Sequence, residues 1–460
     1  MSTRAIILAA GKGTRMKCDL PKVLHTVCGR SIFEWVIEAA RAAGADDITV
    51  VVGHGAEAVV AALPAGVRAV VQEQQNGTGH ATRTALAAMG GVSSDTVLVI
   101  PGDSPLFRPD TLTALVSRHH ESGGACTLLT TTMPDPTGYG RVVRNEAGVA
   151  AIVEERDADE AARSIDEVAV STYAFAGSAL TEALTRLTTR NDQGEEYLTD
   201  VVALFAAAGP VATHTIDDHR ETLGINSHDQ LADAEWVMRE RINRRLMAAG
   251  VWMQDPTTTY VDATVAIAAG ARLYAGVHLE GATSVAAGAV VGPQSFVIDS
   301  TVGPGARVWY SVVRGAEIGE GADVGPFASL RPGTTLAEGV KAGTFVEVKA
   351  STIGKGSKVP HLSYVGDTTI GEDSNVGAGT ITCNYDGFRK HHTTIGSRVF
   401  IGSDTMLVAP VEIGDDAVTG AGSVITRDVS PGALAVERSP QKEIPGYAER
   451  RARLADSEGE

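Results

Sequence analysis

An aliphatic side chain recurs at every sixth position through long stretches of the C-terminal half of this sequence. One run consists of Leu273, Leu279, Val285, Val291 and Val297, and further runs start at Ile318 and Ile395. Most of these residues are followed by glycine or alanine. Such hexads are typical of a parallel β-helix, because the aliphatic residue can point into a triangular prism while the small residue lets the backbone turn the corner. We expect about nine or ten coils, stacked about 4.8 Å apart as in any parallel ladder.

Hexads of this pattern resemble the left-handed parallel β-helix family, although the general rule for parallel crossovers favours a right-handed coil. The resemblance therefore implies a left-handed coil. The period breaks most clearly between Thr382 and Thr393. Because a solenoid accommodates an insertion as a loop on one face, we expect this segment to project and to carry binding residues.

The first 208 residues follow a different pattern. Short apolar runs at 5–10, 48–52 and 97–100 alternate with amphipathic stretches such as 31–43. This alternation is typical of βαβ units on a mostly parallel sheet. It predicts a Rossmann-like α/β domain.

A long helix is predicted between the two halves. Ser227 and Gln230 have the spacing of a capping box, an apolar stripe follows them, and Gly250 can end the helix. A chain of 460 residues also exceeds what one hydrophobic core usually serves. We therefore predict a first domain over residues 1–226, a linker helix over 227–250 and a β-helix domain over 251–460.

Charge and cysteine content limit the classes of partner. The formal net charge is -17, with 39 Lys and Arg residues against 56 Asp and Glu residues. We therefore expect no nonspecific binding to nucleic acid or to an anionic membrane. The four cysteines include no CxxC pair, and the apolar run near the N-terminus is too short for a signal-peptide core or a membrane span. These features predict a soluble cytoplasmic protein.

A glycine-rich turn follows the first apolar run, in the string LAAGKGTRM from Leu8 to Met16. Backbone N–H groups of such a turn can surround phosphate oxygens, and Arg15 and Lys22 add cations. The string matches neither the GxGxxG nor the GxxxxGK[ST] pattern, so an ordinary dinucleotide site or P-loop is not indicated. A turn of this kind can also be purely structural.

LAAGKGTRM, followed by PKVLH, resembles the signature of sugar-1-phosphate nucleotidyltransferases. The strings QEQQNGTGH from Gln72, PGD at 101–103, PTGYGR at 136–141 and GIN at 224–226 extend the resemblance. It implies a role for each matched residue. Those roles are nucleotide binding by Leu8, Ala9, Ala10, Gly11, Arg15, Gln72, Gly77 and Thr78, phosphate binding by Lys22, sugar binding by Gly140 and Glu154, and Mg²⁺ binding by Asp103 and Asn226.

The reaction of that family explains these residue types. A sugar-1-phosphate oxygen attacks the α-phosphorus of UTP, and pyrophosphate leaves. The nucleophile is already anionic, so the barrier is electrostatic and no general base is required. Mg²⁺ prefers oxygen ligands and keeps several waters, so the Asp103 carboxylate, the Asn226 amide oxygen and substrate phosphates form a suitable set.

The sequence departs from the family pattern in the sugar-binding region. Family members usually carry an Asn-Ser/Thr-Gly string, whose asparagine contacts the sugar, where this chain has Ala169-Val170-Ser171. Either a neighbour such as Ser171 substitutes, or sugar binding is weaker or altered. Losing one such hydrogen bond commonly costs about 1–3 kcal/mol.

A second set of strings lies on the predicted β-helix. They are RPG from Arg331, FVEVK ending at Lys349, HLSYVGD from His361, GAGTITCNYDG from Gly377, IGSDT from Ile401 and AGS from Ala421. With the first set they resemble the bifunctional N-acetylglucosamine-1-phosphate uridyltransferase/glucosamine-1-phosphate acetyltransferase over nearly the whole chain. The resemblance implies a homotrimer, with the acetyl site between subunits.

The same resemblance assigns residues to the acetyltransferase site. It implies His361 as general base, Arg331, Lys349, Tyr364 and Asn375 around the sugar phosphate, and Ala378, Asn384, Tyr385, Ser403, Ala421 and Arg438 around acetyl-coenzyme A. Histidine suits the task, because an ordinary pKa of about 6.5 lets it accept the proton of an attacking amine near neutrality.

Spacing supports part of this assignment. Arg331 and Lys349 are 18 residues apart, so they return to the same face one coil on and can clamp a phosphate, although such charges are often only solvated surface groups. Cys383 leaves a covalent acyl-thiol route open. His391 and His392 are predicted to be a solvated loop pair rather than a metal site.

Three functional hypotheses remain. The first is a bifunctional enzyme that converts glucosamine-1-phosphate through N-acetylglucosamine-1-phosphate to UDP-N-acetylglucosamine, with UTP and acetyl-coenzyme A as co-substrates and Mg²⁺ as cofactor. The second keeps only the acetyltransferase, with an impaired or redirected nucleotidyltransferase. The third is a non-enzymatic, trimeric scaffold that binds a sugar nucleotide.

Overall fold

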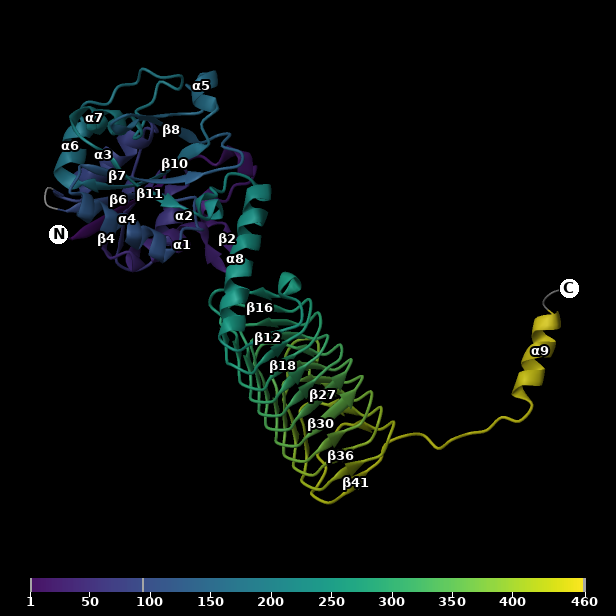
Figure 1. The fold of residues 1–460 in the computed structure, drawn as a ribbon. Coiled ribbons are helices and arrows are strands. Elements are labelled where there is room, and N and C mark those ends of the chain that lie inside the picture. Colours follow the sequence, from purple (N-terminus) through teal and green to yellow (C-terminus); the bar gives the residue numbers. More distant parts are fainter. Residues whose placement is uncertain (1, 93–94, 458–460) are drawn as a thin grey trace. The chain divides into compact units, whose positions relative to one another are not determined.

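The computed structural model describes residues 2–92 and 95–457. The chain divides into two compact units, which cover residues 1–242 and 243–460. A single helix, α8 (His228–Ala248), crosses this division (Figure 1). The domain boundaries drawn from the sequence stay a prediction.

The first unit is built on a mixed nine-stranded sheet. Its main path runs in the order β11 (Ala212–Ile216), β7 (Cys126–Thr132), β10 (Glu167–Ala176), β6 (Thr96–Pro101), β1 (Thr3–Ala9), β4 (Ala45–Val52) and β5 (Val67–Val71). The hairpin β8 (Gly140–Asn145) and β9 (Gly148–Val153) joins at β10. Strand β1 pairs in parallel with both β4 and β6, so the chain order switches direction there, and open α/β sheets commonly bind ligands at such a point.

Helices cover both faces of this sheet. They are α1 (Ile32–Ala42), α2 (Ala56–Ala61), α3 (Thr78–Ala88), α4 (Pro109–Ser122), α5 (Glu160–Arg163), α6 (Gly177–Leu184) and α7 (Asp200–Ala208). Because side chains alternate along a strand, Ile7 packs with α1 and α4 on one face while Ile6 packs with α3, α6 and α7 on the other. The predicted βαβ architecture is confirmed, with β10 running antiparallel to its neighbours.

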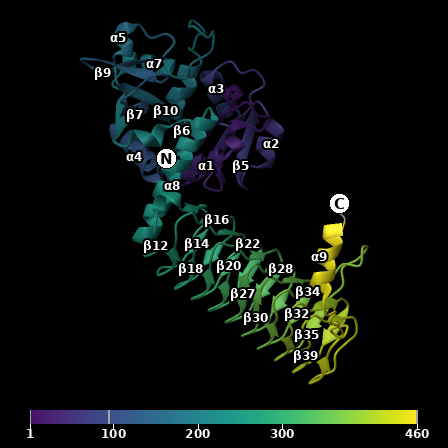
Figure 2. The ribbon, with the colours of Figure 1, turned by 90° about the vertical axis from the view of Figure 1, so that its right-hand side faces the viewer.

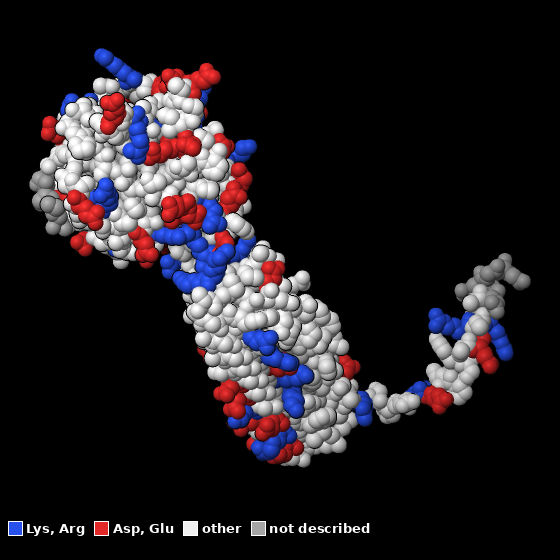
Figure 3. All heavy atoms as spheres, viewed as in Figure 1, with Lys and Arg blue, Asp and Glu red and all other residues white. Residues whose placement is uncertain are grey.

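Short elements complete the unit. They are the 3-10 turns η1 (Thr14–Met16), η2 (Lys22–Leu24) and η3 (His219–Thr222) and the strands β2 (Thr26–Val27) and β3 (Arg30–Ser31). On the face that Figure 3 shows, acidic and basic side chains are interspersed over this unit. No helix among the described residues is both long and apolar enough to cross a membrane.

The second unit is a parallel β-helix made of three sheets (Figure 2). Sheet C contains β12 (Trp252–Met253), β15 (Arg272–Leu273), β18 (Val290–Val291), β21 (Arg307–Val308), β24 (Asp323–Val324), β27 (Lys341–Thr344), β30 (Lys358–His361), β33 (Asn375–Val376), β36 (Phe400–Ile401), β39 (Val418–Thr419) and β41 (Leu434–Ala435). Sheet D contains β13 (Tyr260–Val261), β16 (His278–Glu280), β19 (Phe296–Ile298), β22 (Val312–Arg314), β25 (Ser329–Leu330), β28 (Glu347–Lys349), β31 (Tyr364–Gly366), β34 (Ile381–Cys383), β37 (Met406–Val408) and β40 (Val424–Ile425). Sheet E contains β14 (Ala266–Ile267), β17 (Ser284–Val285), β20 (Thr301–Val302), β23 (Ala316–Ile318), β26 (Thr334–Leu336), β29 (Thr352–Ile353), β32 (Thr368–Ile370), β35 (Thr393–Ile395) and β38 (Val411–Ile413).

The aliphatic hexad residues form the core of the β-helix, as predicted. Leu273 pairs with Val291 and Leu279 with Val297, each one coil on, and all four side chains are fully buried. Fully burying a side chain of this size contributes about 1.5–3 kcal/mol relative to leaving it exposed. The repeat therefore stabilises every coil through the coils above and below it.

Two further helical elements lie in this unit, the 3-10 turn η4 (Pro256–Thr258) and the helix α9 (Tyr447–Ser457). The main break in the repeat is the loop 384–392, between β34 and β35. The loop is closed at its base by a hydrogen bond from the His391 backbone N–H to the Asn384 carbonyl, 2.8 Å long. The predicted projecting segment thus begins at Asn384.

Candidate functional site

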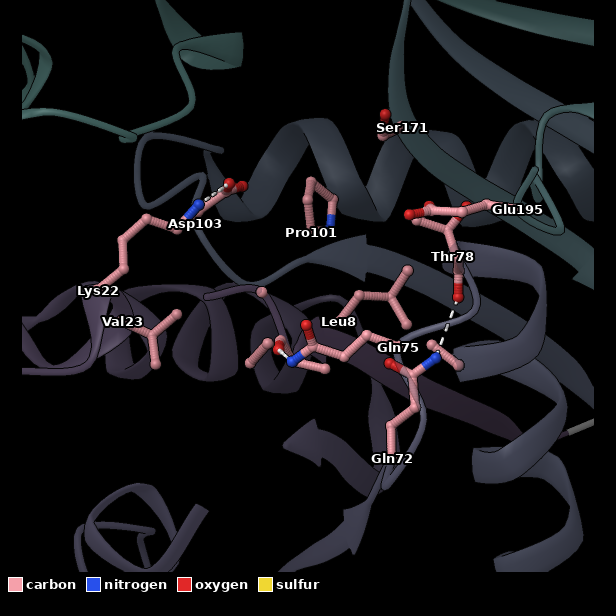
Figure 4. A pocket seen from close by; sticks show the side chains of 15 residues that line it. Leu8, Lys22, Val23, Gln72, Gln75, Thr78, Pro101, Asp103, Ser171 and Glu195 are labelled. Atoms are coloured by element: carbon pink, nitrogen blue, oxygen red, sulfur yellow. Dashed lines mark hydrogen bonds and ion pairs between the residues drawn. The ribbon is translucent and has the colours of Figure 1, made fainter. Parts of the chain in front are cut away.

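A cavity of about 410 Å³ opens at the carboxyl ends of the parallel strands of the first unit (Figure 4). It is lined by Leu8, Ala9, Ala10, Gly11, Lys22, Val23, Gln72, Gln75, Gly77, Thr78, Ala81, Pro101, Asp103, Ser171 and Glu195. Most residues that the sequence predicts for the nucleotide and metal therefore lie around one space. Arg15 is exposed on η1, and it is outside this lining, as are Gly140, Glu154 and Asn226.

The turn after β1 forms one wall of the cavity. Gln75 Nε2 donates a hydrogen bond of 2.6 Å to the Ala10 carbonyl, which ties the turn to the segment after β5. The backbone N–H of Gly102 donates to the Leu8 carbonyl at 2.8 Å. These bonds hold the carboxyl ends of β1, β5 and β6 together at the switch point of the sheet.

The start of helix α3 forms another part of the cavity lining. Gly77 precedes the helix with φ +101°, and a Cβ there would lie 2.5 Å from the Glu196 carbonyl, so glycine is required. Gln72 Nε2 donates to the Gly77 carbonyl at 3.1 Å, and the Leu198 backbone N–H donates to Thr78 Oγ1 at 3.0 Å. The positive end of the α3 dipole therefore faces a cavity suited to an anionic ligand.

Three side chains predicted for phosphate and metal converge at the edge of the cavity. The Lys22 ammonium donates to Asp103 Oδ2 at 2.6 Å and to Asn226 Oδ1 at 2.8 Å. Asn226 is held by a hydrogen bond from its backbone N–H to Gln230 Oε1 at the start of α8, 2.8 Å long. The carboxylate and the amide oxygen thus point at one cation position.

This donor set fits Mg²⁺. One carboxylate oxygen and one amide oxygen are hard ligands, and Mg²⁺ completes its shell with waters and substrate phosphates. Across residues 2–92 and 95–457, no group of three or more His, Cys, Asp or Glu side chains forms a metal-binding cluster. A divalent ion here would therefore take its remaining ligands from water and from substrate phosphates.

The residues predicted for the sugar lie outside the cavity lining, Gly140 at the start of β8 and Glu154 directly after β9. Gly140 pairs with Ala169, and a Cβ on Gly140 would lie 3.5 Å from Glu154 Oε2. Burial raises the pKa of Glu154, and a hydrogen bond of 2.9 Å from Thr199 Oγ1 partly offsets that effect. Gly140, Glu154 and Ala169 therefore lie together.

The departure at 169–171 has clear structural consequences. Ala169 is buried in the core on the α3 side of the sheet, and Val170 is buried on the other side. The pairing of β10 with β7 is interrupted after Ala169, and Ser171 adopts φ +54°, a left-handed conformation that costs a non-glycine residue about 1–2 kcal/mol. Ser171 lines the cavity.

Sequence reasoning missed two polar residues of this cavity. Gln75 lies in the matched string QEQQNGTGH but was not assigned a role, and Glu195 lies outside every matched string. The contact of Gln75 with Ala10 depends on two segments 65 residues apart. Only the folded sheet brings them together.

On the β-helix, the two predicted phosphate-binding cations each have a carboxylate partner. Arg331 Nη1 lies 2.9 Å from Glu347 Oε1, and Lys349 Nζ lies 3.0 Å from each carboxylate oxygen of Asp367. Arg331 and Lys349 sit at the ends of neighbouring strands β25 and β28. The spacing of 18 residues does place them one coil apart.

The predicted general base, His361, ends strand β30 and is exposed. Its carbonyl accepts hydrogen bonds from Ser363 Oγ at 2.8 Å and from the Gly379 backbone N–H at 3.4 Å. The next coil therefore brings Ala378 and Gly379 beside His361.

Other predicted residues of this site are linked to each other. Asn384 Nδ2 lies 3.4 Å from the Tyr364 hydroxyl, Asn375 pairs with Lys358 in sheet C, and Arg438 Nη1 donates to the Ala421 carbonyl at 2.8 Å. Tyr385 is exposed in the loop 384–392. The Ser403 carbonyl accepts from the Gly422 backbone N–H at 2.8 Å, which joins the coils that carry Ser403 and Ala421.

Cys383 and the histidine pair have ordinary surroundings. Burial raises the pKa of the Cys383 thiol, which disfavours the thiolate that an acyl-thiol route needs. His391 Nε2 lies 2.6 Å from Asp386 Oδ2, and His392 Nε2 lies 3.0 Å from Thr369 Oγ1. These contacts suit a polar loop, as predicted.

Sequence reasoning also missed the carboxylates Glu347 and Asp367 and the loop residue Lys390. The coil period could have found Asp367, because it follows Lys349 by 18 residues. The Lys390 amine lies near the Lys349 amine, and the interaction between them raises the pKa of Lys349 and lowers the pKa of Lys390.

Comparison with known proteins agrees with both halves of this description. Residues 5–200 match the model of the MobA-like NTP transferase domain, and residues 392–427 match that of the bacterial transferase hexapeptide, six repeats. The bifunctional protein GlmU of Streptomyces avermitilis is 51% identical over 97% of this chain and 94% of its own length. GlmU of Streptomyces coelicolor is 50% identical over the same shares, and GlmU of Corynebacterium glutamicum is 46% identical over 98% of this chain and 94% of its own length.

Identity of this extent covers the α/β sheet, helix α8 and the β-helix together. The chain therefore belongs to the family of bifunctional GlmU proteins.

Proposed function

We propose that this chain makes UDP-N-acetylglucosamine in two steps at two separate sites. At one site, acetyl-coenzyme A acetylates glucosamine-1-phosphate. At the other, UTP transfers its uridylyl group to N-acetylglucosamine-1-phosphate. The observation that carries this proposal is the cavity at the switch point of the sheet, where the turn 8–11, Lys22 and Asp103 meet.

In the uridylyl step, the turn after β1 and the N-terminus of α3 hold the nucleotide through backbone N–H groups. Lys22 binds its phosphates. Gly140 and Glu154 hold the sugar so that its phosphate oxygen faces the α-phosphorus, and pyrophosphate leaves in the opposite direction. Mg²⁺, held by Asp103 and Asn226, supplies charge neutralisation on the phosphates when it is bound.

In the acetyl step, the amine of glucosamine-1-phosphate attacks the thioester carbon of acetyl-coenzyme A. His361 accepts the proton that the amine loses, and coenzyme A leaves as a thiol. Arg331, Lys349, Tyr364 and Asn375 hold the sugar phosphate. Acetyl-coenzyme A lies against Ala378, Asn384, Tyr385, Ser403, Ala421 and Arg438.

We further propose a homotrimer in the cytoplasm. A column of exposed apolar side chains supports the trimer, because Tyr310, Phe327, Phe345 and Leu362 are 41%, 54%, 58% and 61% exposed on successive coils. Leu362 directly follows His361, so a subunit that covers this column also reaches the acetyl site. Free thiols at Cys18, Cys126 and Cys383 fit a reducing compartment.

Two assays test the proposal. Pyrophosphate release is measured with UTP, N-acetylglucosamine-1-phosphate and Mg²⁺, and thiol release with acetyl-coenzyme A and glucosamine-1-phosphate. We expect the native protein to show both, with D103N losing only the first activity and H361N only the second. Thiol release without pyrophosphate release would favour the impaired-transferase hypothesis, and neither activity would favour the scaffold.

A further inference from the structure

Asp367 occupies a corner of the β-helix in an unfavourable backbone conformation. It lies between β31 and β32 with φ +48°, in the left-handed region that non-glycine residues rarely adopt. Its backbone N–H donates to the Lys349 carbonyl at 3.0 Å, and its carbonyl accepts from the Thr393 backbone N–H at 3.2 Å. Other corners of the β-helix, such as Asp299 and Asp416, share this conformation, so it belongs to the repeat and the contacts of the side chain must show whether Asp367 has a task.

The Asp367 carboxylate joins two groups from different coils. Both of its oxygens lie 3.0 Å from Lys349 Nζ, and Oδ2 also accepts a hydrogen bond of 2.5 Å from Asn384 Nδ2. Lys349 belongs to the preceding coil, and Asn384 begins the loop 384–392 on the following coil. Each partner has a proposed substrate, the sugar phosphate for Lys349 and acetyl-coenzyme A for Asn384.

Charge explains why a carboxylate is needed at this position. Lys349 and Lys390 are neighbours, and two ammonium groups so close repel each other unless an anion compensates them. Partial burial by itself raises the pKa of Asp367, but the hydrogen bonds from Lys349 and Asn384 outweigh that effect and keep it below the ordinary value. The carboxylate is therefore ionised at neutral pH and able to hold Lys349.

We propose that Asp367 is a positioning residue for acetyl transfer. It fixes the Lys349 ammonium for the sugar phosphate and the Asn384 amide for acetyl-coenzyme A, and so sets the distance between the two substrates. This inference rests on the proposed acetyl-transfer site.

The β-helix offers a matched control. Asp416 also has a left-handed backbone, with φ +57°, and its carboxylate oxygens lie 2.7 and 2.8 Å from Arg398 Nε and Nη2. Neither Asp416 nor Arg398 has a proposed substrate. Replacing Asp416 therefore measures what the loss of such a corner ion pair does to the fold alone.

The test compares D367N and D367G with D416N and D416G. Asparagine and glycine both tolerate the left-handed conformation, so neither introduces backbone strain. In D367N the amide oxygen can still accept from Asn384, so we expect the KM for glucosamine-1-phosphate to rise about tenfold while the KM for acetyl-coenzyme A changes less than about twofold. In D367G both KM values should rise.

A double variant tests whether Asp367 acts on the KM for glucosamine-1-phosphate through Lys349. If Asp367 acts through Lys349, D367N should add little to the KM for glucosamine-1-phosphate once K349M is present. Native KM values in both D367 variants, or equal changes in the D416 variants, would overturn the inference. A native protein that releases no thiol from acetyl-coenzyme A would instead overturn the proposed function, and the inference with it.

Discussion

Lys22 and Asp103 form an ion pair of 2.6 Å at the place where the sequence predicts a metal ion. The same ammonium lies 2.8 Å from the Asn226 amide oxygen, so it contacts both oxygens proposed as Mg²⁺ ligands. A divalent ion and an ammonium group cannot share this position, because like charges at such a distance repel strongly. We therefore expect Lys22 to move away from these two oxygens when they bind a metal ion.

Replacing Lys22 should strengthen metal binding in the absence of nucleotide. We expect K22M to bind Mn²⁺ at least about tenfold more tightly than the native protein, because Asp103 and Asn226 no longer have an internal cation. Electron paramagnetic resonance of free Mn²⁺ during a titration measures this without any turnover. K12M serves as control, since Lys12 is exposed on the turn after β1 and its replacement makes the same change in charge.

Equal tightening in K12M would mean that net charge alone is responsible. A loss of Mn²⁺ binding in K22M would show that Lys22 does not compete for the metal site.

Restoring an amide at position 169 should improve sugar binding. Asparagine there would lie beside Gly140 and could donate to the sugar, so we expect A169N to lower the KM for N-acetylglucosamine-1-phosphate about tenfold in the pyrophosphate assay. The KM for UTP should stay within about twofold, because Ala169 is not among the residues that line the cavity with the turn 8–11.

S171G tests whether the Ser171 hydroxyl already replaces the missing amide at position 169. Glycine suits the observed φ of +54°, so this variant removes the hydroxymethyl side chain without straining the backbone. Should A169N have no effect while S171G raises the KM for the sugar phosphate, the Ser171 hydroxyl already fills the missing contact.

Replacing His361 should separate the two activities. We expect H361N to lower the rate of acetyl transfer about 100-fold to 10,000-fold, because the variant lacks the group proposed to take the proton from the attacking amine. Pyrophosphate release and the thermal midpoint should stay close to native values, since the side chain is exposed and its carbonyl makes the local hydrogen bonds. A parallel fall in both activities would point to misfolding rather than to lost chemistry.

The stability of the first unit should fall on acidification because of His119. Burial, with a smaller contribution from His120, lowers the pKa of His119 from 6.5 to about 4, and its Nδ1 lies 3.1 Å from Thr127 Oγ1. Between these values the unfolded chain binds a proton that the folded chain does not. The contribution of neutral His119 to the free energy of unfolding is therefore complete above pH 6.5. It is lost as the pH falls toward 4, which lowers the free energy of unfolding by up to about 3 kcal/mol.

Urea unfolding at pH 7 and pH 5 measures this dependence. H119Q should flatten the slope of stability against pH, whatever its effect at neutral pH, while H54Q should keep the native slope because His54 is exposed. An unchanged slope in H119Q would assign the acid sensitivity to other groups.

Periodic features were predictable, and contacts between distant segments were not. The hexads predict the β-helix because each aliphatic residue meets its equivalent one coil on, as Leu273 meets Val291. The direction of β10 could not be predicted, because alternation of apolar residues is the same in parallel and antiparallel strands.

In the candidate sites too, individual residues could be predicted from the sequence but their contacts could not. Lys22, Asp103 and Asn226 could be named from matched strings, but their convergence depends on segments up to 204 residues apart. Asp367 received no role because the strings place it within HLSYVGD without showing its partners. Its importance comes from Lys349 and Asn384 on the two adjoining coils.

Three of the cations proposed to bind a phosphate each have a carboxylate partner: Lys22 has Asp103, Arg331 has Glu347 and Lys349 has Asp367. A singly charged anion such as chloride gains little by competing for a cation that is already neutralised. A phosphate monoester, which carries about two negative charges at neutral pH, gains considerably more. The internal carboxylates therefore weaken the binding of singly charged anions more than the binding of phosphate monoesters. Both sites are expected to bind phosphorylated substrates even when chloride is present in excess.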